Sequence, residues 1–320
     1  MWKYIIRRLL LLIPVMLGVT IVVFSIMYLV PGDPAVAILG TEAEPEALEA
    51  LRIKLNLDKP YLVRLGIYLY QVFLRFDLGE SYLTGNGVMQ DLMMRFPYTL
   101  TLDLACIFIS LLGIPLGVYA ATHQNKTGDY IAIVTSLIGV SIPGFWLALM
   151  LVLLFANTLR ILPAYGVGGF QFWILPILAS SLFGIGMLAR QTRSSMLEVI
   201  NSDYIVMARS KGLSERKVIY KHALPNALIP VITIIGTSFG ALLGGNVLTE
   251  TIFTIPGIGN YMVKAVNNRD YPCVQGSVLM LSLAFSIIMI ITDLALAYTD
   301  PRIKAQFIHV EKKRGGNHDQ

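Results

Sequence analysis

The chain has 320 residues, of which 55% are hydrophobic and only 14% are charged, and its formal net charge is +5. Soluble domains carry about 25% charged residues, so this composition excludes a soluble globular protein, a disordered chain and a nucleic-acid-binding protein. The two cysteines, Cys106 and Cys273, are too few for a disulfide framework or a thiolate metal site. The composition therefore predicts an all-α polytopic membrane protein.

Six segments are apolar and long enough, or nearly so, to cross a hydrocarbon core of about 30 Å, which needs about 20 helical residues. They are 9–30, 99–121, 131–156, 173–189, 227–248 and 271–292. The fourth is the shortest, and the aromatic side chains that precede it are typical of a membrane interface. We therefore expect about six transmembrane helices.

The first apolar segment follows Lys3, Arg7 and Arg8, so it could be a cleaved signal peptide or a retained anchor. It is longer than the usual apolar core of a signal peptide and lacks a small-residue cleavage site, so we interpret 1–30 as an N-terminal transmembrane anchor. Short loops rich in Lys and Arg stay in the cytoplasm, and the richest loop is 190–226. Both termini are therefore expected on the cytoplasmic side.

The remainder of the chain divides into three parts. Residues 31–98 form a predicted extracytoplasmic helical segment, in which apolar residues at helical spacing predict amphipathic helices over 42–56 and 61–76. Residues 99–304 carry the other five spans, and 305–320 are expected to be a polar cytoplasmic tail.

The sequence lacks the motifs of common enzyme sites. It has no phosphate-binding P-loop, no H-E-x-x-H zinc motif and no G-x-S-x-G nucleophile elbow. The four histidines, His123, His222, His309 and His318, have no metal-ligand spacing. We therefore expect that the chain is not an enzyme and holds no metal ion or cofactor of its own.

An ion-driven transporter places ionisable side chains within the bilayer, where they bind the coupling ion. Here only Asp103 qualifies, with Asp293 at the inner end of the last predicted span. Both lie within about one turn of a predicted span end, which favours a carboxylate that reaches interfacial water over a proton relay. The sequence therefore predicts that any transport is energised from outside this chain.

The inside segment 190–226 predicts a helix-turn-helix. Polar residues at 201–203 provide an N-cap for a short helix, and Gly212 suits the C′ position after its last turn. Ser214 begins a second helix, which is expected to end near Pro225.

A basic helix-turn-helix has three interpretations. The flanking apolar segments place this one at the bilayer, which disfavours DNA binding. Its basic residues could instead attract anionic lipid, at about 1 kcal/mol each. A docking surface for a cytoplasmic partner is favoured by Ala208 and Gly212, a small-x-x-x-small pair that lets another backbone approach closely.

The same segment carries a resemblance to a known family. Residues 207–213, Met-Ala-Arg-Ser-Lys-Gly-Leu, and 222–227, His-Ala-Leu-Pro-Asn-Ala, resemble the EAA loop of ATP-binding-cassette importer permeases, most closely those for dipeptides, oligopeptides and nickel. Further motifs that agree lie at 31–34, 77–81, 97–100, 256–259 and 269–272. The first two positions of the general consensus fall on Val206 and Met207, where this chain departs from it.

The resemblance implies a permease subunit in the bacterial cytoplasmic (inner) membrane, with 99–304 as the permease core and 190–226 as the coupling loop. It implies a second homologous permease, two cytoplasmic ATPase subunits that bind ATP and Mg, an extracytoplasmic substrate-binding protein and contact with membrane lipid, but no nucleic acid. The residues implied to couple to an ATPase subunit are Ala208, Arg209, Lys211, Gly212, Leu213, Glu215, His222, Leu224 and Pro225.

The sequence leaves open the identity of the solute and the structure of one outer segment. Di- or oligopeptides are the solutes that the resemblance favours, and glutathione or nickel complexes are alternatives. A stand-alone ion-coupled secondary transporter is the other functional class. Residues 249–270 are too short to span, so they predict a re-entrant or interfacial hairpin or a packed loop.

Overall fold

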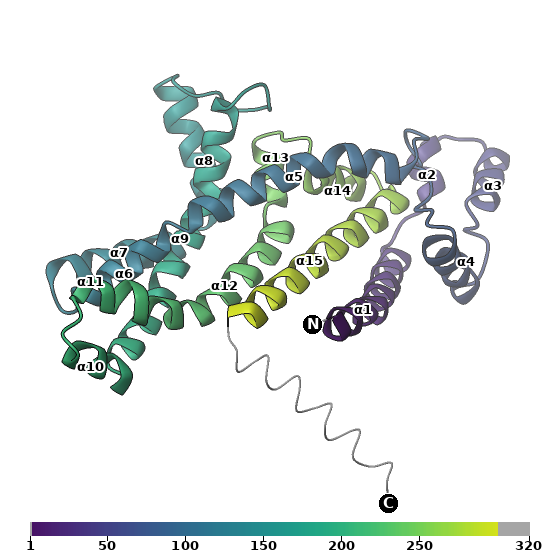
Figure 1. Ribbon diagram of the computed structural model, residues 1–320. Helices are drawn as coiled ribbons and strands as arrows, with labels where there is room; N and C mark the ends of the chain where they lie inside the picture. Colours follow the sequence, from purple (N-terminus) through teal and green to yellow (C-terminus); the bar gives the residue numbers. More distant parts are fainter. Residues whose placement is uncertain (1, 300–320) are drawn as a thin grey trace, which may run out of the picture. The chain divides into compact units, whose positions relative to one another are not determined.

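The structure is a computed structural model that describes residues 2–299, and its regular elements in this range are helices (Figure 1). Five helices are long and apolar enough to cross a membrane, and a sharply bent pair supplies a sixth if it is one span. The five are Arg8–Leu29, Val88–Thr122, Gln171–Ile200, Glu215–Gly244 and Tyr271–Tyr298. These helices confirm the predicted all-α polytopic class. The predicted tail, 305–320, lies outside the described residues.

The chain divides into two compact units. The first comprises the described residues up to Leu100 together with Thr254–Ser286, and the second comprises Thr101–Phe253 together with the described residues from Ile287 onward. The domain boundaries drawn from the sequence alone stay a prediction.

The first unit contains short helices as well as membrane-spanning ones. Its helices are α1 (Trp2–Leu29), α2 (Pro34–Leu39), α3 (Pro45–Lys54), α4 (Tyr61–Leu74) and α14 (Ile258–Asn267), with parts of α5 (Val88–Ser110) and α15 (Tyr271–Thr299). The two amphipathic helices expected in 31–98 are present as α3 and α4. Helix α2 was not expected; Asp33 caps it by accepting a hydrogen bond from the Ala35 backbone N–H at 2.9 Å.

Helix α5 begins at Val88, well before the apolar segment that predicted it. Its first turns contain polar side chains that contact Tyr261 of α14 inside the first unit. The Tyr261 hydroxyl donates to Asp91 at 3.1 Å, and the Arg95 guanidinium lies 4.4 Å from the centre of the Tyr261 ring. A hydropathy pattern alone cannot find a helix turn whose charges are paired with a distant segment.

The second unit contains most of the remaining helices. They are α6 (Gly113–Thr122), α7 (Thr127–Ser141), α8 (Gly144–Leu151), η1 (Val152–Thr158), α9 (Gln171–Ile200), α10 (Asp203–Ser210), α11 (Glu215–Lys217), η2 (Val218–Ala223), α12 (Leu224–Gly245) and α13 (Val247–Ile252), with η1 and η2 being π-helical.

The third predicted span, 131–156, is a sharply bent pair of helices and not one straight helix. Helix α7 ends at Ser141, α8 begins at Gly144, and the two segments are bent by 94°. Pro143 explains the break, because proline has no N–H to donate and disfavours helical backbone in the residue before it. Ile142 accordingly has an extended backbone, with φ −80° and ψ 121°.

Helix α9 is the central packing element of the second unit, and it contacts α6, α7, α8 and α12. It begins at Gln171 and ends at Ile200, so the short fourth span that the sequence predicted is confirmed and extended. Helix α6 approaches it very closely through glycine. A Cβ atom at Gly117 would lie 2.5 Å from the backbone oxygen of Ala189, so a larger residue there would push the helices apart.

Residues 249–270 form no span of their own. They contribute the end of α13 and the whole of α14, joined through Phe253 and Ile255, whose side chains are buried. The position of this segment relative to the bilayer stays a prediction.

Candidate functional site

Helix α10 lies at the turn between α9 and the long helical stretch that ends with α12 (Figure 1). Ser202 occupies its N-cap position with extended backbone, as the sequence predicts. The expected side-chain cap is absent from this helix, because the Ser202 hydroxyl instead donates to the Val199 backbone oxygen at 2.6 Å. That bond ties α10 to the end of α9.

The turn after α10 has the geometry predicted for Gly212. Its φ is +76°, in the left-handed region, and its N–H donates to the Arg209 backbone oxygen at 2.9 Å. The Lys211 N–H donates to the Met207 backbone oxygen at 3.1 Å, which closes the last turn. No heavy atom lies within 4 Å of where a Gly212 Cβ would be, so the space beside the turn is open.

An ion pair spans this turn. Arg209 Nη2 lies 2.7 Å from Glu215 Oε1, and Arg209 Nε lies 3.2 Å from Glu215 Oε2. The two parallel contacts orient the guanidinium and the carboxylate together, which is the geometry of a bidentate pair. Two residues of the predicted coupling set thus hold the two sides of the turn in register. Both side chains are exposed, so the pair orients the turn but contributes little to the free energy of unfolding.

The second helix of the motif does not end near Pro225, as the sequence predicted. It continues from α11 through η2 into α12, and the apolar window of the span begins at Glu215. A proline inside an α-helix removes one N–H and crowds the preceding turn. The wider π-helical turn at Val218–Ala223 comes directly before the proline and accommodates it. The coupling loop is therefore continuous with a membrane helix.

The inner face of α10 packs on an apolar core of the second unit. Ile205 is fully buried and Ala208 is 8% exposed, and they contact a cluster from α6, α9, η2 and α12. Leu213 and Leu224 are partly buried against the same cluster. Ala208 therefore serves the chain's own packing, and of the small pair only Gly212 borders open space.

The outer face of α10 carries large apolar side chains that the sequence reading did not single out. Tyr204 is 45% exposed, Val206 53% and Met207 59%. Because Ile205 and Ala208 are three residues apart and face inward, helical periodicity could have placed Tyr204 and Met207 on the outer side. We call Tyr204, Val206 and Met207 the outer face of α10.

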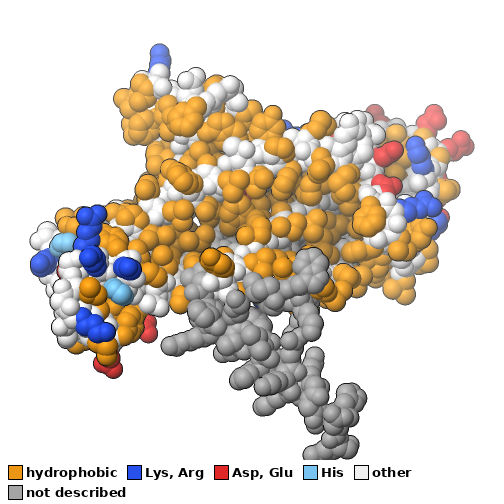
Figure 2. Space-filling model, viewed as in Figure 1, with side chains coloured by type: hydrophobic (Ala, Val, Ile, Leu, Met, Phe, Trp, Pro, Cys, Tyr) orange, Lys and Arg blue, Asp and Glu red, His pale blue; other side chains and the backbone are white. Residues whose placement is uncertain are grey.

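Basic side chains are exposed on α10 and on the segment that follows it. In Figure 2, Lys and Arg gather over the part of the second unit that carries α10 and α11. The exposed members are Arg209, Lys211, Arg216, Lys217 and Lys221. Of the other predicted coupling residues, Pro225 is exposed and His222 is half-buried.

A buried ion pair fixes the helices beneath the loop. Arg193 on α9 donates to both carboxylate oxygens of Asp129 on α7, at 2.6 and 2.7 Å, and Asp129 also accepts from the Asn125 backbone N–H at 3.0 Å. The Asp129 side chain is 2% exposed and that of Arg193 23%. This pair joins the first turn of α7 to α9.

Asp103 is not a helix-end group, and that expectation was wrong. It lies inside α5, is 0% exposed, and its Oδ1 accepts a hydrogen bond from Asn246 Nδ2. Glu250 is buried nearby at 1% exposure, and Thr249 exchanges a hydrogen bond with Ser180 at 3.0 Å. These residues form a buried polar cluster that joins α5, α9 and α13 inside the second unit. Asp293 also lies within a helix, because α15 continues to Thr299.

The helical arrangement defines a class of protein by its likeness to solved structures. An inward-facing structure of the MetNI methionine ABC transporter matches with a TM-score of 0.58 at 17% identity, over 66% of this chain and 97% of that chain. A second crystal form of the same transporter matches with a TM-score of 0.55. The fold is therefore shared with a chain of that methionine ABC transporter.

The sequence places the chain within a family. Residues 113–305 match the model of the binding-protein-dependent transport system inner membrane component, and residues 1–103 match the model of its N-terminal region. The chain belongs to this family of binding-protein-dependent transport system inner membrane components.

Three relatives illustrate the family. The dipeptide transport system permease protein DppB of Alkalihalophilus pseudofirmus is 44% identical, over 95% of this chain and all of the relative. A putative peptide transport system permease protein of Brucella abortus is 43% identical over 95% of this chain and 99% of its own length. The glutathione transport system permease protein GsiC of Salmonella choleraesuis is 39% identical, with the same coverage.

The family resemblance inferred from the sequence motifs is therefore confirmed. The chain is a permease of an ATP-binding-cassette importer and a multi-pass protein of the inner membrane, and it works as one component of a larger assembly. Its role is transport rather than catalysis.

Proposed function

We propose that this permease imports di- or oligopeptides. It would do so with a second homologous permease, two cytoplasmic ATPase subunits that bind ATP and Mg, and an extracytoplasmic substrate-binding protein. The observation that carries the choice of solute is the 43–44% identity, over 95% of this chain, to permeases named for dipeptide and peptide transport. This chain holds no cofactor of its own in the proposal.

The coupling loop is the proposed contact with an ATPase subunit. Its outer face offers Tyr204 and Met207 as apolar anchors, and the same loop carries exposed Lys and Arg. A complementary groove would be apolar at its centre and acidic at its rim, because anchors gain energy in dry pockets while charges steer association. Gly212 leaves open space that allows the groove to approach the turn.

The proposed mechanism uses the stiffness of the loop's attachments. Ile205 and Ala208 fasten α10 to the core of the second unit, and the Arg209–Glu215 pair closes the turn. Helix α9 leads into the loop, and the stretch from α11 to α12 leads out of it without a break. When nucleotide-driven closure of the ATPase subunits moves α10, α9 and α12 move with it and switch access to the pathway.

The proposed orientation places α10 and both termini in the cytoplasm. Exposed Lys and Arg around α10 support it, because short loops on the cytoplasmic side are enriched in these residues. A cysteine-accessibility scan checks the orientation. Residues near Glu46 and Lys264 are expected to label from outside, and residues near Lys211 and Lys304 only from inside. External labelling at Lys211 would contradict it.

The experiment that tests the importer mechanism is an uptake assay with a labelled dipeptide. Replacing the phosphate-binding lysine of the copurifying ATPase subunit is expected to abolish uptake, while collapse of the proton gradient at constant ATP leaves it intact. Uptake that survives the lysine replacement and disappears with the proton gradient would contradict the proposal and favour ion-coupled transport.

A second solute is supported by one relative, the permease named for glutathione transport. Because the 39% identity of that relative is lower, we rank glutathione second. Competition separates the two: unlabelled tripeptides with ordinary α-peptide bonds are expected to block dipeptide uptake, whereas glutathione, whose first peptide bond is γ-linked, is not. Dominant inhibition by glutathione would reverse the ranking.

A further inference from the structure

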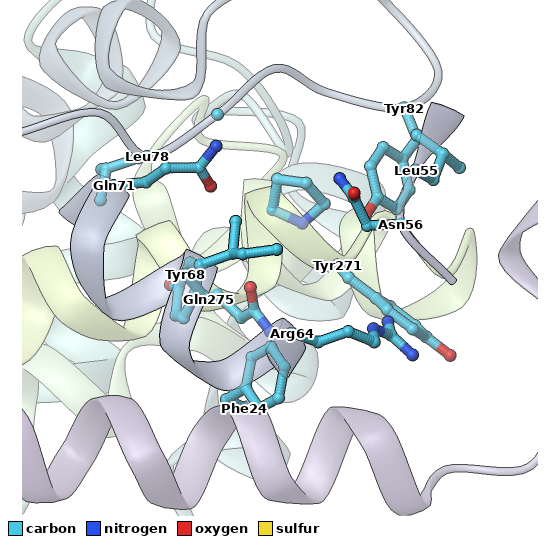
Figure 3. A pocket seen from close by; sticks show the side chains of 13 residues that line it. Phe24, Leu55, Asn56, Arg64, Tyr68, Gln71, Leu78, Tyr82, Tyr271 and Gln275 are labelled. Atoms are coloured by element: carbon cyan, nitrogen blue, oxygen red, sulfur yellow. The ribbon is translucent and has the colours of Figure 1, made fainter. Parts of the chain in front are cut away.

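A polar cavity of about 110 Å³ lies inside the first unit (Figure 3). Helices α1 and α4 and the first turns of α15 form its walls, together with the loop before α5. Its polar lining comprises Arg64, Tyr68, Gln71, Tyr82, Tyr271 and Gln275. The volume far exceeds the roughly 10–15 Å³ that a single water molecule requires. The cavity is therefore large enough for a small polar group.

Several hydrogen-bond donors in this cavity have no partner among the described residues. Gln275 is 6% exposed and makes no side-chain hydrogen bond there, and the buried Tyr68 hydroxyl also has none. Arg64 forms no ion pair within residues 2–299 and lies over the Tyr28 ring at 5.4 Å. Buried polar groups normally have partners, so this set of donors is suited to hold a polar ligand.

The charge in and around the cavity selects an anion. No Asp or Glu lines it, and Arg64 supplies a positive charge. Two neighbouring carboxylates are already engaged: Asp33 lies 2.6 Å from Arg52, and Asp270 accepts from Ser81 at 2.5 Å.

The remaining groups are suited to donate hydrogen bonds to that anion. Burial raises the pKa of the Tyr68 phenol, so its hydroxyl stays protonated and remains a donor. Gln71 and Gln275 each add an amide N–H₂. One guanidinium, two amides and a phenol match the several oxygens of a phosphate better than a single carboxylate.

The surroundings of the cavity are those of a membrane interface. Phe24, which lines it, lies about 7.5 Å along the axis from the last residue of α1, so the cavity is within two turns of that end of the apolar span. On and beside α4, large apolar side chains are exposed: Leu62 is 76% exposed, Leu74 70% and Phe76 78%. An amphipathic helix of this kind lies in the interface with its apolar face among lipid chains.

We propose that this cavity binds the phosphodiester group of a membrane phospholipid. Arg64 neutralises its charge, and Gln71, Gln275 and the Tyr68 hydroxyl donate to its oxygens. The acyl chains lie along the apolar surfaces of α1 and α4. The bound lipid thereby links α1, α4 and α15 within the first unit.

The test is native mass spectrometry of the full chain, purified with its partner subunits from nanodiscs of phosphatidylglycerol and phosphatidylcholine. We expect one phospholipid to resist removal by detergent. Arg64→Gln is expected to reduce its occupancy roughly ten-fold, because a charge-assisted contact is lost. Arg75→Gln is the matched control, since Arg75 lies on the C-cap of the same helix, contacts Tyr70 and does not line the cavity.

A second variant keeps the proposal testable if Arg64→Gln fails to fold. Gln275→Leu conserves side-chain volume, removes one donor and is expected to lower occupancy to a smaller extent. Equal losses in Arg64→Gln and Arg75→Gln would overturn the proposal in favour of diffuse charge attraction. Displacement of the lipid by inorganic phosphate, or by a dipeptide, would overturn the lipid assignment in favour of a soluble anion.

Discussion

The two units of the permease are stabilised by different interactions. In the first, side-chain hydrogen bonds join segments that are far apart in the sequence, such as Ser81 to Asp270 at 2.5 Å and Tyr261 to Asp91 at 3.1 Å. In the second, α9 contacts its neighbours through small residues, and Gly117 has no room for a Cβ. The first unit shows mainly polar links of this kind, and the second combines polar links with helix contacts that leave no room for larger side chains.

Both units contain helices apolar enough to span a membrane, so the rules of packing in lipid apply to both. Within lipid there is no hydrophobic driving force between helices, so close packing of small residues provides the contact energy. Where a buried polar group is present, its partner must be present too, because lipid cannot replace it. The second unit holds the Asp129–Arg193 ion pair and the buried polar cluster around Asp103, and the ion pair, which joins two full charges, is expected to be the more sensitive site.

The largest loss of stability is expected for Asp129→Asn. The substitution removes the charge that pairs with Arg193, and breaking a buried ion pair costs about 3 kcal/mol, the lower end of the usual range because Arg193 is 23% exposed. Thermal unfolding of the purified protein measures it. In a double-mutant cycle with Arg193→Gln, additive effects would contradict the pairing.

The next effect is expected in the first unit. Asp270→Asn weakens hydrogen bonds from the Ser81 hydroxyl and the Tyr82 N–H, which lie 2.5 and 3.1 Å from its carboxylate oxygens. Loss of hydrogen bonds to a charged group costs about 1.5–3 kcal/mol. Asp77→Asn is the control, because Asp77 accepts only from the exposed Gly79 N–H. If both variants unfold at the same temperature, the polar network does not stabilise the first unit.

The smallest effect is expected for Gly117→Ala, which tests whether side-chain volume or helix propensity decides stability in the second unit. Gly117→Ala gains about 1 kcal/mol of helix propensity but crowds the Ala189 oxygen, at an overpacking cost of about 1–3 kcal/mol. A net destabilisation of up to about 2 kcal/mol is expected. Gly244→Ala has nothing within 4 Å of its Cβ and is expected to stabilise the protein instead. Changes of the same sign would contradict the packing account.

Part of the fold could be predicted from the sequence because it depends on local pattern. Apolar length gave the spans, amphipathic spacing predicted α3 and α4, and Gly212 at a helix end predicted the left-handed turn. Pro143, which causes the break after α7, stands in the sequence, but the apolar residues on both sides of it make 131–156 resemble a single uninterrupted span.

The rest depends on partners that a linear pattern does not reveal. The hydropathy pattern places Asp103 near a span end, whereas α5 begins at Val88 and so encloses this residue. Its hydrogen-bond partner, Asn246, lies 143 residues away in the sequence. Ala208 looked like a docking residue, but it packs on the chain's own core. Pairings between distant segments decide which side of a short helix faces outward.

The central proposal is that the turn after α10 couples this permease to an ATPase subunit, and Gly212 tests it most directly. The measurement is peptide uptake together with ATPase-subunit association for Gly212→Val, Gly212→Asn and the control Lys211→Gln. Valine at φ +76° adds about 1–3 kcal/mol of local strain and fills the open space beside the turn. We predict that Gly212→Val inserts normally but loses both activities, that Gly212→Asn is milder because asparagine tolerates this conformation, and that Lys211→Gln changes little. Full association and uptake in Gly212→Val, with loss in Lys211→Gln, would contradict the account.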